Sequence, residues 1–151
     1  VRDQMIGLSG GRNHDRSIAK LSRRIIIGGV LMINPIHAAF DFVAFKRAFV
    51  SKDVKTWLGF FAEDAEWIEY KPTHPPKTPR IMKGKSEIRD FLADVKASKF
   101  TLAIEDEVVG PNRAGFCVWC TFPDGKQVVE NVIIHISDGK ITRQVDVEAW
   151  D

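Results

Sequence analysis

The sequence predicts a single α+β domain in which three N-terminal helices pack against one face of an antiparallel sheet. Two observations lead to this class. Residues 36–97 contain three stretches with apolar side chains at helical spacing, and residues 100–150 contain four runs rich in β-branched and aromatic residues. Helices and strands in separate blocks are typical of α+β folds. A chain of 151 residues is long enough for one such domain with a buried core.

The charge of the chain is unevenly distributed. Residues 1–31 contain six Lys or Arg and two Asp or Glu, so residues 32–151 carry a formal net charge of −2 although the whole chain carries +2. The domain itself therefore has no excess of basic residues, and we expect no nucleic-acid partner. No apolar run approaches the roughly 18 residues of a membrane span, so we expect no membrane partner.

Residues 1–31 are expected to lie outside the domain, as a disordered or spurious leader. Gly28-Gly29 is what a purine-rich bacterial ribosome-binding site encodes when translated, and Met32 follows at the distance of a start codon. The alternatives are a twin-arginine export signal, because Ser22-Arg23-Arg24 precedes the apolar residues 25–33, or a basic membrane-surface anchor. The leader hypothesis implies a cytoplasmic protein of residues 32–151, and the signal hypothesis implies an exported one.

The first helix is expected to open at Asn34-Pro35, because proline is well tolerated in the first turn. Its apolar side chains, which we expect to be largely buried, are Ile36, Phe40, Phe42, Val43, Phe45 and Phe49. Ser51 is expected to cap a second helix with apolar residues at i, i+3, i+4 and i+7, namely Val54, Trp57, Leu58 and Phe61. Ser86 is expected to cap a third helix, with the same spacing at Ile88, Phe91, Leu92 and Val95.

Five strands are expected. A short strand covers residues 65–70, and a loop with four prolines follows over residues 71–84, which cannot join the interior of a sheet. The remaining strands are residues 100–109, 114–122, 127–136 and 140–150. Asp124-Gly125 and Asp138-Gly139 separate the last three strands, and Asp-Gly between such runs is a strong hairpin signal.

The two cysteines, Cys117 and Cys120, lie in one of these strands. Residues three apart on a strand point to opposite faces, so the two thiols cannot readily form a disulfide. No second Cys or His pair stands at zinc-binding spacing, and the four histidines are scattered. We therefore expect buried thiols, with no metal and no cofactor.

Three short phrases occur in an order and spacing that cover residues 40–150: Phe60-Phe-Ala-Glu-Asp-Ala-Glu-Trp67, Gly84-Lys-Ser-Glu-Ile-Arg-Asp-Phe91 and Ser137-Asp-Gly-Lys-Ile141. They resemble the nuclear-transport-factor-2-like superfamily, and within it the SnoaL-like and ketosteroid-isomerase-like proteins. The resemblance implies a cone-shaped domain, with a curved antiparallel sheet packed against three N-terminal helices as in the SnoaL-like α+β barrel. It is specific for the fold and not for the function.

The resemblance also implies a general base at Glu69, the position of the isomerase carboxylate on the short strand. The isomerase tyrosine that donates to the developing oxyanion falls on Phe45, and the partner acid falls near Val132; neither side chain is a donor. An isomerase of the usual mechanism depends on those donors. We therefore do not expect a steroid isomerase of that mechanism.

Strand alternation, with the phase taken from the resemblance, predicts which side chains face a pocket. Glu69 and Asp146 are the expected acid–base residues, with His74 in the proline-rich loop as a second acid–base group. The expected ligand-binding residues are Phe45, Trp57, Trp67, Trp119, Thr121, Glu130, Val132, Gln144 and Glu148. The alternative is that these acids pair with arginines or reach solvent, and that His74 is a solvated loop residue.

Two functions fit this pattern. The first is a cofactor-free lyase, isomerase, cyclase or dehydratase that acts on a small hydrophobic or aromatic carbonyl compound by general acid–base catalysis. The second is a non-catalytic ligand-binding or dimeric accessory domain. Both faces of the sheet are apolar in places, so we also expect a homodimer through the outer face.

Overall fold

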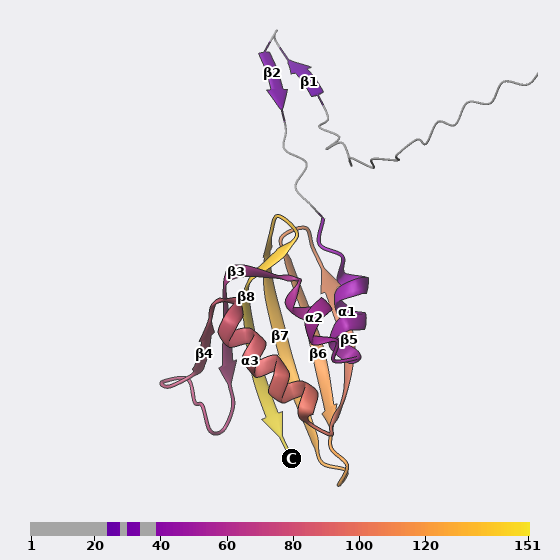
Figure 1. Ribbon diagram of the computed structural model, residues 1–151, viewed down its shortest axis with the longest axis vertical. Helices are drawn as coiled ribbons and strands as arrows, with labels where there is room; N and C mark the ends of the chain where they lie inside the picture. Colours follow the sequence, from indigo (N-terminus) through magenta and orange to yellow (C-terminus); the bar gives the residue numbers. More distant parts are fainter. Residues whose placement is uncertain (1–23, 28–29, 34–38) are drawn as a thin grey trace, which may run out of the picture. The chain divides into compact units, whose positions relative to one another are not determined.

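The computed structural model describes residues 24–27, 30–33 and 39–151 (Figure 1). The chain divides after Ile36 into two units. In the first, β1 (Arg24–Ile27) pairs antiparallel with β2 (Val30–Ile33). The predicted leader lies mostly outside the described residues; it stays a prediction, as do the export signal and the cytoplasmic location. In the described residues no helix is both long and apolar enough to cross a membrane.

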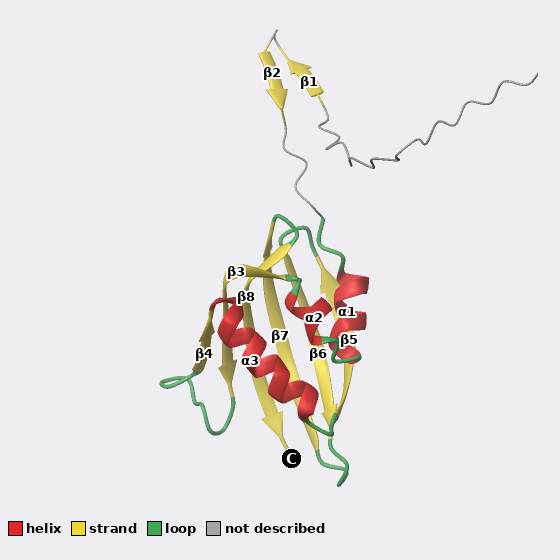
Figure 2. Cartoon of the chain, viewed as in Figure 1, coloured by secondary structure: helices red, strands yellow, loops and turns green. Residues whose placement is uncertain are grey.

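The second unit is an α+β domain built on one open, curved sheet of six strands in the order β4-β3-β8-β7-β6-β5. Its strands are β3 (Phe61–Tyr70), β4 (Arg80–Lys83), β5 (Thr101–Val109), β6 (Arg113–Thr121), β7 (Gln127–Ser137) and β8 (Lys140–Trp150). All neighbours are antiparallel except β3 and β8. Its helices are α1, α2 and α3, and Figure 2 shows them on one face of this sheet, which confirms the predicted cone fold.

The helices begin at caps other than the predicted ones. The predicted opening at Asn34-Pro35 lies outside the described residues, and α1 (Phe42–Val50) begins at Asp41, whose carboxylate accepts from the backbone of Ala44 at 2.9 Å. Asp53, not Ser51, caps α2 (Val54–Leu58), and α3 (Gly84–Ala97) begins two residues before Ser86. A carboxylate oxygen satisfies free N–H groups of the first turn as well as a hydroxyl does.

Two segments differ from the sequence prediction. Phe61 starts β3 instead of extending the second helix, because α2 ends at Leu58 and the chain turns at Gly59. Residues 80–83, predicted as loop, form β4, which pairs with β3 at the edge of the sheet. This edge position agrees with the expectation that the proline-rich segment stays out of the sheet interior.

The tight hairpin between β7 and β8 matches its predicted signal. Asp138 and Gly139 have φ of 50° and 72°, and positive φ at both central residues is the requirement of a type I′ turn. The core lies between the sheet and the helices, and Phe45 at its centre has no exposed surface. Its ring packs against Phe49, whereas Val43 on the same helix is 69% exposed, contrary to the prediction for this side chain.

Candidate active site

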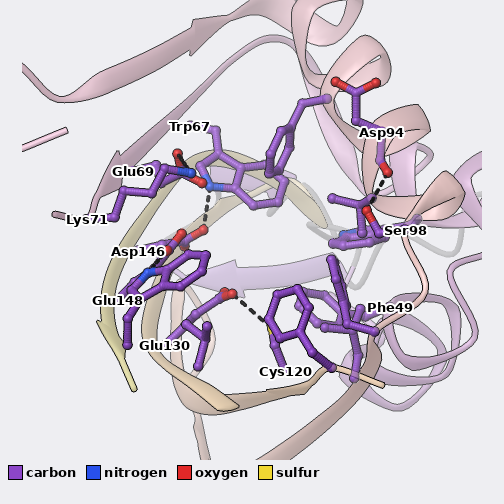
Figure 3. A pocket seen from close by; sticks show the side chains of 18 residues that line it. Phe49, Trp67, Glu69, Lys71, Asp94, Ser98, Cys120, Glu130, Asp146 and Glu148 are labelled. Atoms are coloured by element: carbon purple, nitrogen blue, oxygen red, sulfur yellow. Dashed lines mark hydrogen bonds and ion pairs between the residues drawn. The ribbon is translucent and has the colours of Figure 1, made fainter. Parts of the chain in front are cut away.

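A cavity of ≈ 180 Å³ lies between the inner face of the sheet and the three helices (Figure 3). Seven aromatic side chains, here called the aromatic wall, line it: Phe49, Trp57, Trp67, Phe91, Phe100, Phe122 and Trp150. Five acids also line it, and four of them are here called the carboxyl cluster: Glu69, Glu130, Asp146 and Glu148. In Figure 3 the cluster gathers on one side of the cavity, across from Asp94 and Ser98. The cavity thus has one polar side in a largely aromatic lining.

The register of three strands brings the carboxyl cluster together. Glu69 on β3 lies directly opposite Asp146 on β8, and Glu148 on β8 lies directly opposite Glu130 on β7. Asp146 and Glu148 are two residues apart on one strand and therefore share a face. Like charges directly opposite each other on neighbouring strands are destabilising, and this site contains two such pairs.

Asp146 is the most constrained member of the cluster. It is 3% exposed, and its carboxylate accepts hydrogen bonds from Trp67 Nε1 at 2.5 Å and from Gln144 Nε2 at 3.1 Å. Trp67 is itself held by ring contacts with Phe61 and Phe91. Burial, followed by the charge of the nearby Glu130, raises the pKa of Asp146 well above its ordinary value, although the two donors oppose this.

Glu69 is the acid with a cationic partner. Its carboxylate is 3% exposed, and Lys71 Nζ lies 2.8 Å from Glu69 Oε2. The pair lacks the geometry of a hydrogen bond, but the ammonium of Lys71 occupies the space next to this buried oxygen. Lys71 also lines the cavity, so the charge of Glu69 has its partner within the site.

The other two acids are shifted toward their neutral forms. Burial and the charges of Glu130 and Glu69 raise the pKa of Glu148 to about 8, and a hydrogen bond to Glu69 adds to this effect because it favours the protonated acid. Burial also raises the pKa of Glu130, whose carboxylate accepts from the Cys120 thiol at 3.1 Å. Burial and the charge of Glu130 raise the pKa of that thiol, so Cys120 is an unreactive donor.

Six of the predicted site residues line this one cavity. They are Trp57, Trp67, Glu69, Glu130, Asp146 and Glu148. Three others are buried but not part of its lining: Phe45 and Val132 belong to the core, and Gln144 supports Asp146 from the side. Strand alternation therefore places the acids on the correct face of β3, β7 and β8.

The predicted alternation on β6 is wrong by one residue. Trp119 and Thr121 point to the outer face of the sheet, while Phe116, Val118 and Cys120 are buried on the inner face. Trp119 and Thr121 therefore do not line the cavity. A shift of one residue reverses every side chain of a strand, which explains why both positions fail together.

His74 is also outside the lining of the cavity. Its backbone forms a bridge with Lys71 in the loop after β3, and its ring nitrogen Nδ1 lies 3.0 Å from Thr73 Oγ1. The sequence prediction missed Lys71, which follows the last residue of β3 and lines the cavity. It also missed the ring of Trp150, whose Nε1 donates to Glu148 at 2.6 Å.

The chemistry available to this site is proton transfer. The carboxyl groups of Glu69 and Glu148 are neighbours in different environments. Glu69 has the cation Lys71 beside it, whereas the pKa of Glu148 is raised. Such a difference commonly separates the base from the acid in a catalytic pair. Across the described ranges, no group of three or more His, Cys, Asp or Glu side chains is arranged to hold a metal ion.

Comparison with known proteins shows which family this chain belongs to. The model of the SnoaL-like domain family matches residues 42–144. No curated protein is similar enough in sequence to match.

Solved structures share the fold at low sequence identity. An NTF2-like protein of unknown function from Mesorhizobium loti is 16% identical, with a TM-score of 0.63 over 72% of this chain and 87% of its own. A candidate ketosteroid isomerase from Kribbella flavida is 17% identical, with a TM-score of 0.60 over 73% of this chain and 74% of its own. A candidate isomerase from Bacillus subtilis is 21% identical, with a TM-score of 0.57 over 72% and 83%.

Proposed function

This chain belongs to the SnoaL-like domain family, and we propose that its cavity performs isomerase-type proton transfer on a small organic molecule. The observation that carries the proposal is the carboxyl cluster itself, four acids facing one aromatic cavity. Such a concave, mostly apolar site with a few convergent polar groups is the usual form of a small-molecule site. Carboxyl groups with shifted pKa values are typical of acid–base catalysis.

In this proposal Glu69 removes a proton from the substrate and Glu148 supplies one. Glu69 suits a base because its carboxyl group lines the cavity beside the cationic Lys71, whose Nζ lies 2.8 Å from Glu69 Oε2. Glu148 suits an acid because its pKa of about 8 keeps it protonated at neutral pH. Asp146, opposite Glu69, is the second candidate for either role.

The size of the cavity limits the substrate. An engineered apolar cavity of roughly 150 Å³ holds benzene. The present cavity, ≈ 180 Å³, therefore suits a molecule with a single ring. A small hydrophobic or aromatic carbonyl compound meets both the size and the proton chemistry, and this reaction needs no cofactor.

A proton-exchange assay tests this function without knowledge of the natural substrate. Small ketones such as phenylacetone and 2-cyclohexenone are incubated with the protein in D2O, and loss of the α-proton signal is followed by NMR. The protein is expected to accelerate exchange, and Glu69→Gln to slow the catalysed rate by roughly 10²-fold or more. The matched control is Glu105→Gln, because Glu105 is an exposed residue on β5 that does not line the cavity.

Equal exchange rates in the wild type and Glu69→Gln would sink the proposal. The second candidate function is a non-catalytic binding domain, which is favoured by the burial of Phe45 and Val132 in the core, where neither side chain donates a hydrogen bond. Failure of every ketone to exchange above the buffer rate, together with a co-purified small molecule in native mass spectrometry, would support that function instead.

We also propose that the protein forms a homodimer through the outer face of the sheet. Ile133 on β7 is 44% exposed and Val147 on β8 is 54% exposed, and the half-buried Trp119 faces the same side. Contiguous exposed apolar patches often mark protein–protein interaction sites.

A further inference from the structure

Hydrogen-bond donors among the side chains that line the cavity are nearly all paired. Apart from the acids, five of them have a partner: Lys71 with Glu69, Trp67 with Asp146, Ser98 with the backbone oxygen of Asp94, Cys120 with Glu130, and Trp150 with Glu148. Figure 3 draws the pairs of Trp67 and Cys120 as dashed lines. Trp57 differs, because its Nε1–H is buried and has no hydrogen-bond acceptor among the described residues.

The position of Trp57 indicates what would pair with this donor. Trp57 lies on α2, is 1% exposed and lines the cavity. Its ring packs against Phe49, with 4.3 Å between the ring centroids, and against Trp67, with 6.1 Å. Buried N–H groups in proteins are nearly always paired, and an unpaired one needs an explanation. A donor on a side chain that lines a cavity is explained when the molecule bound there supplies the acceptor.

The charges of the cavity determine the kind of acceptor. Five acids line it, and Lys71, the single cation of the described lining, already lies 2.8 Å from Glu69. A ligand carboxylate would therefore meet like charges without a free cation to pair with. An uncharged acceptor avoids this repulsion. It also leaves in place the proton that the raised pKa of Glu148 retains at neutral pH.

We propose that Trp57 Nε1–H donates a hydrogen bond to an uncharged oxygen of the bound molecule, which is the carbonyl oxygen in the reaction proposed above. This inference rests on the proposed function, since it names the residue that holds the substrate oxygen in the same cavity. Trp57 supplies a donor that Phe45 and Val132, both in the core, cannot supply. Its ring contacts Trp67, which itself binds Asp146, so the donor lies one ring away from the carboxyl cluster.

The donor acts on the charge that develops during proton transfer. As Glu69 takes the α-proton, the electrons of the C–H bond form a carbon–carbon double bond and the carbonyl π electrons move onto the oxygen. Trp57 keeps its proton, because an indole N–H is a donor only, and its hydrogen bond strengthens as the oxygen becomes negative. Glu148 then gives its proton to carbon and the electrons return to the carbonyl group. The net charge of the site is unchanged, since Glu69 has gained the proton that Glu148 has lost.

Two probes of nearly equal shape test the inference. They are phenylacetone and 2-methyl-3-phenylpropene, in which a CH2 group replaces the carbonyl oxygen. Binding to the 15N-labelled full chain is followed by NMR of the indole N–H groups of its four tryptophans, and the Trp57 signal is the one that Trp57→Phe lacks. The ketone is expected to move this signal downfield of its position with the hydrocarbon, because ring-current effects are common to both probes and the hydrogen bond is not.

Two variants separate the hydrogen bond from the packing of the ring. Trp57→Phe is expected to weaken binding of the ketone roughly 5-fold more than binding of the hydrocarbon, which reports the state of the cavity itself. The second variant carries 3-benzothienylalanine at position 57, which keeps the shape of tryptophan and has sulfur in place of the N–H group. The same selective loss is expected there. Catalysed α-proton exchange of phenylacetone is expected to fall roughly 10²-fold in both variants.

Three results would overturn the inference: a Trp57 signal that moves equally with both probes, variants that weaken both probes equally, or neither probe binding. A failure of the proposed function gives a different pattern. If the Trp57 signal responds to the ketone alone but Glu69→Gln exchanges α-protons as fast as the wild type, the donor stands and the catalytic role of Glu69 is wrong. If exchange depends on Glu69 but is equally fast in Trp57→Phe and the wild type, the inference alone is overturned.

Discussion

Replacing Glu148 with Gln is expected to make the free energy of unfolding less dependent on pH. The pKa of Glu148 is about 8 in the folded protein, against an ordinary value of 4.5. Between these two pH values the folded protein holds a proton that the unfolded chain has released. The wild-type protein therefore loses stability as the pH rises from about 4.5 to about 8.

The size of this effect follows from the shift. One pH unit of pKa difference corresponds to about 1.4 kcal/mol, so the full shift sets an upper limit of about 5 kcal/mol. Glu148 is only half-buried, and solvent screening reduces the expected difference to about 2 kcal/mol. Gln resembles the protonated acid and can still accept the hydrogen bond from Trp150 Nε1. The variant is thus expected to match the wild type near pH 5 and to exceed its stability by about 2 kcal/mol at pH 8.

Urea unfolding followed by tryptophan fluorescence at pH 5, 6.5 and 8 measures the difference. Trp57 and Trp67 are both buried, so their emission reports the folded state directly. Glu105→Gln makes the same chemical change at an exposed position and is expected to run parallel to the wild type. A gap between Glu148→Gln and the wild type that stays constant with pH, or that widens toward acid, would refute the reasoning.

Two further substitutions test the core and the outer face. Phe45→Ala is expected to lower the free energy of unfolding by about 3–5 kcal/mol, because Phe45 is fully buried among other rings. Urea unfolding measures this loss, and a value under about 1 kcal/mol would contradict the packing. Ile133→Glu, at a 44% exposed position, is expected to convert the proposed dimer to monomer in light scattering with an unchanged circular-dichroism spectrum. A wild-type protein that is already monomeric would rule out the dimer.

The fold could be predicted because local signals and long-range pattern agree over most of the domain. Asp138-Gly139 is a turn that few other residue pairs can form, and it fixes the pairing of the last two strands. The failures occurred where two signals conflict. Phe61 has the spacing of a helix face, but Gly59 ends the helix before it. Residues 80–83 are too short a run to be recognised beside four prolines.

The candidate site could be predicted only where polarity fixes the phase of a strand. On β8 the polar Gln144, Asp146 and Glu148 alternate with valines, so a choice between the two faces is possible. On β6 both faces are apolar: Phe116 and Val118 alternate with Cys117 and Trp119. When both faces are apolar, the sequence does not show which alternate residues face the cavity, and the choice on β6 came from the family resemblance. An error of one residue in that choice placed Trp119 on the wrong face.

The arrangement of β7 and β8 also changes how the missing isomerase donors should be interpreted. By the family resemblance the partner acid falls near Val132, which cannot donate, and this by itself argues against catalysis. In the sheet, however, Val132 lies directly opposite Asp146, so an acid stands one strand away from the expected place. Burial and Glu130 raise the pKa of Asp146, and a protonated carboxyl group is a hydrogen-bond donor. Carrying roles over residue by residue would miss this acid, because the register of the sheet brings its oxygens close to the expected place from a neighbouring strand.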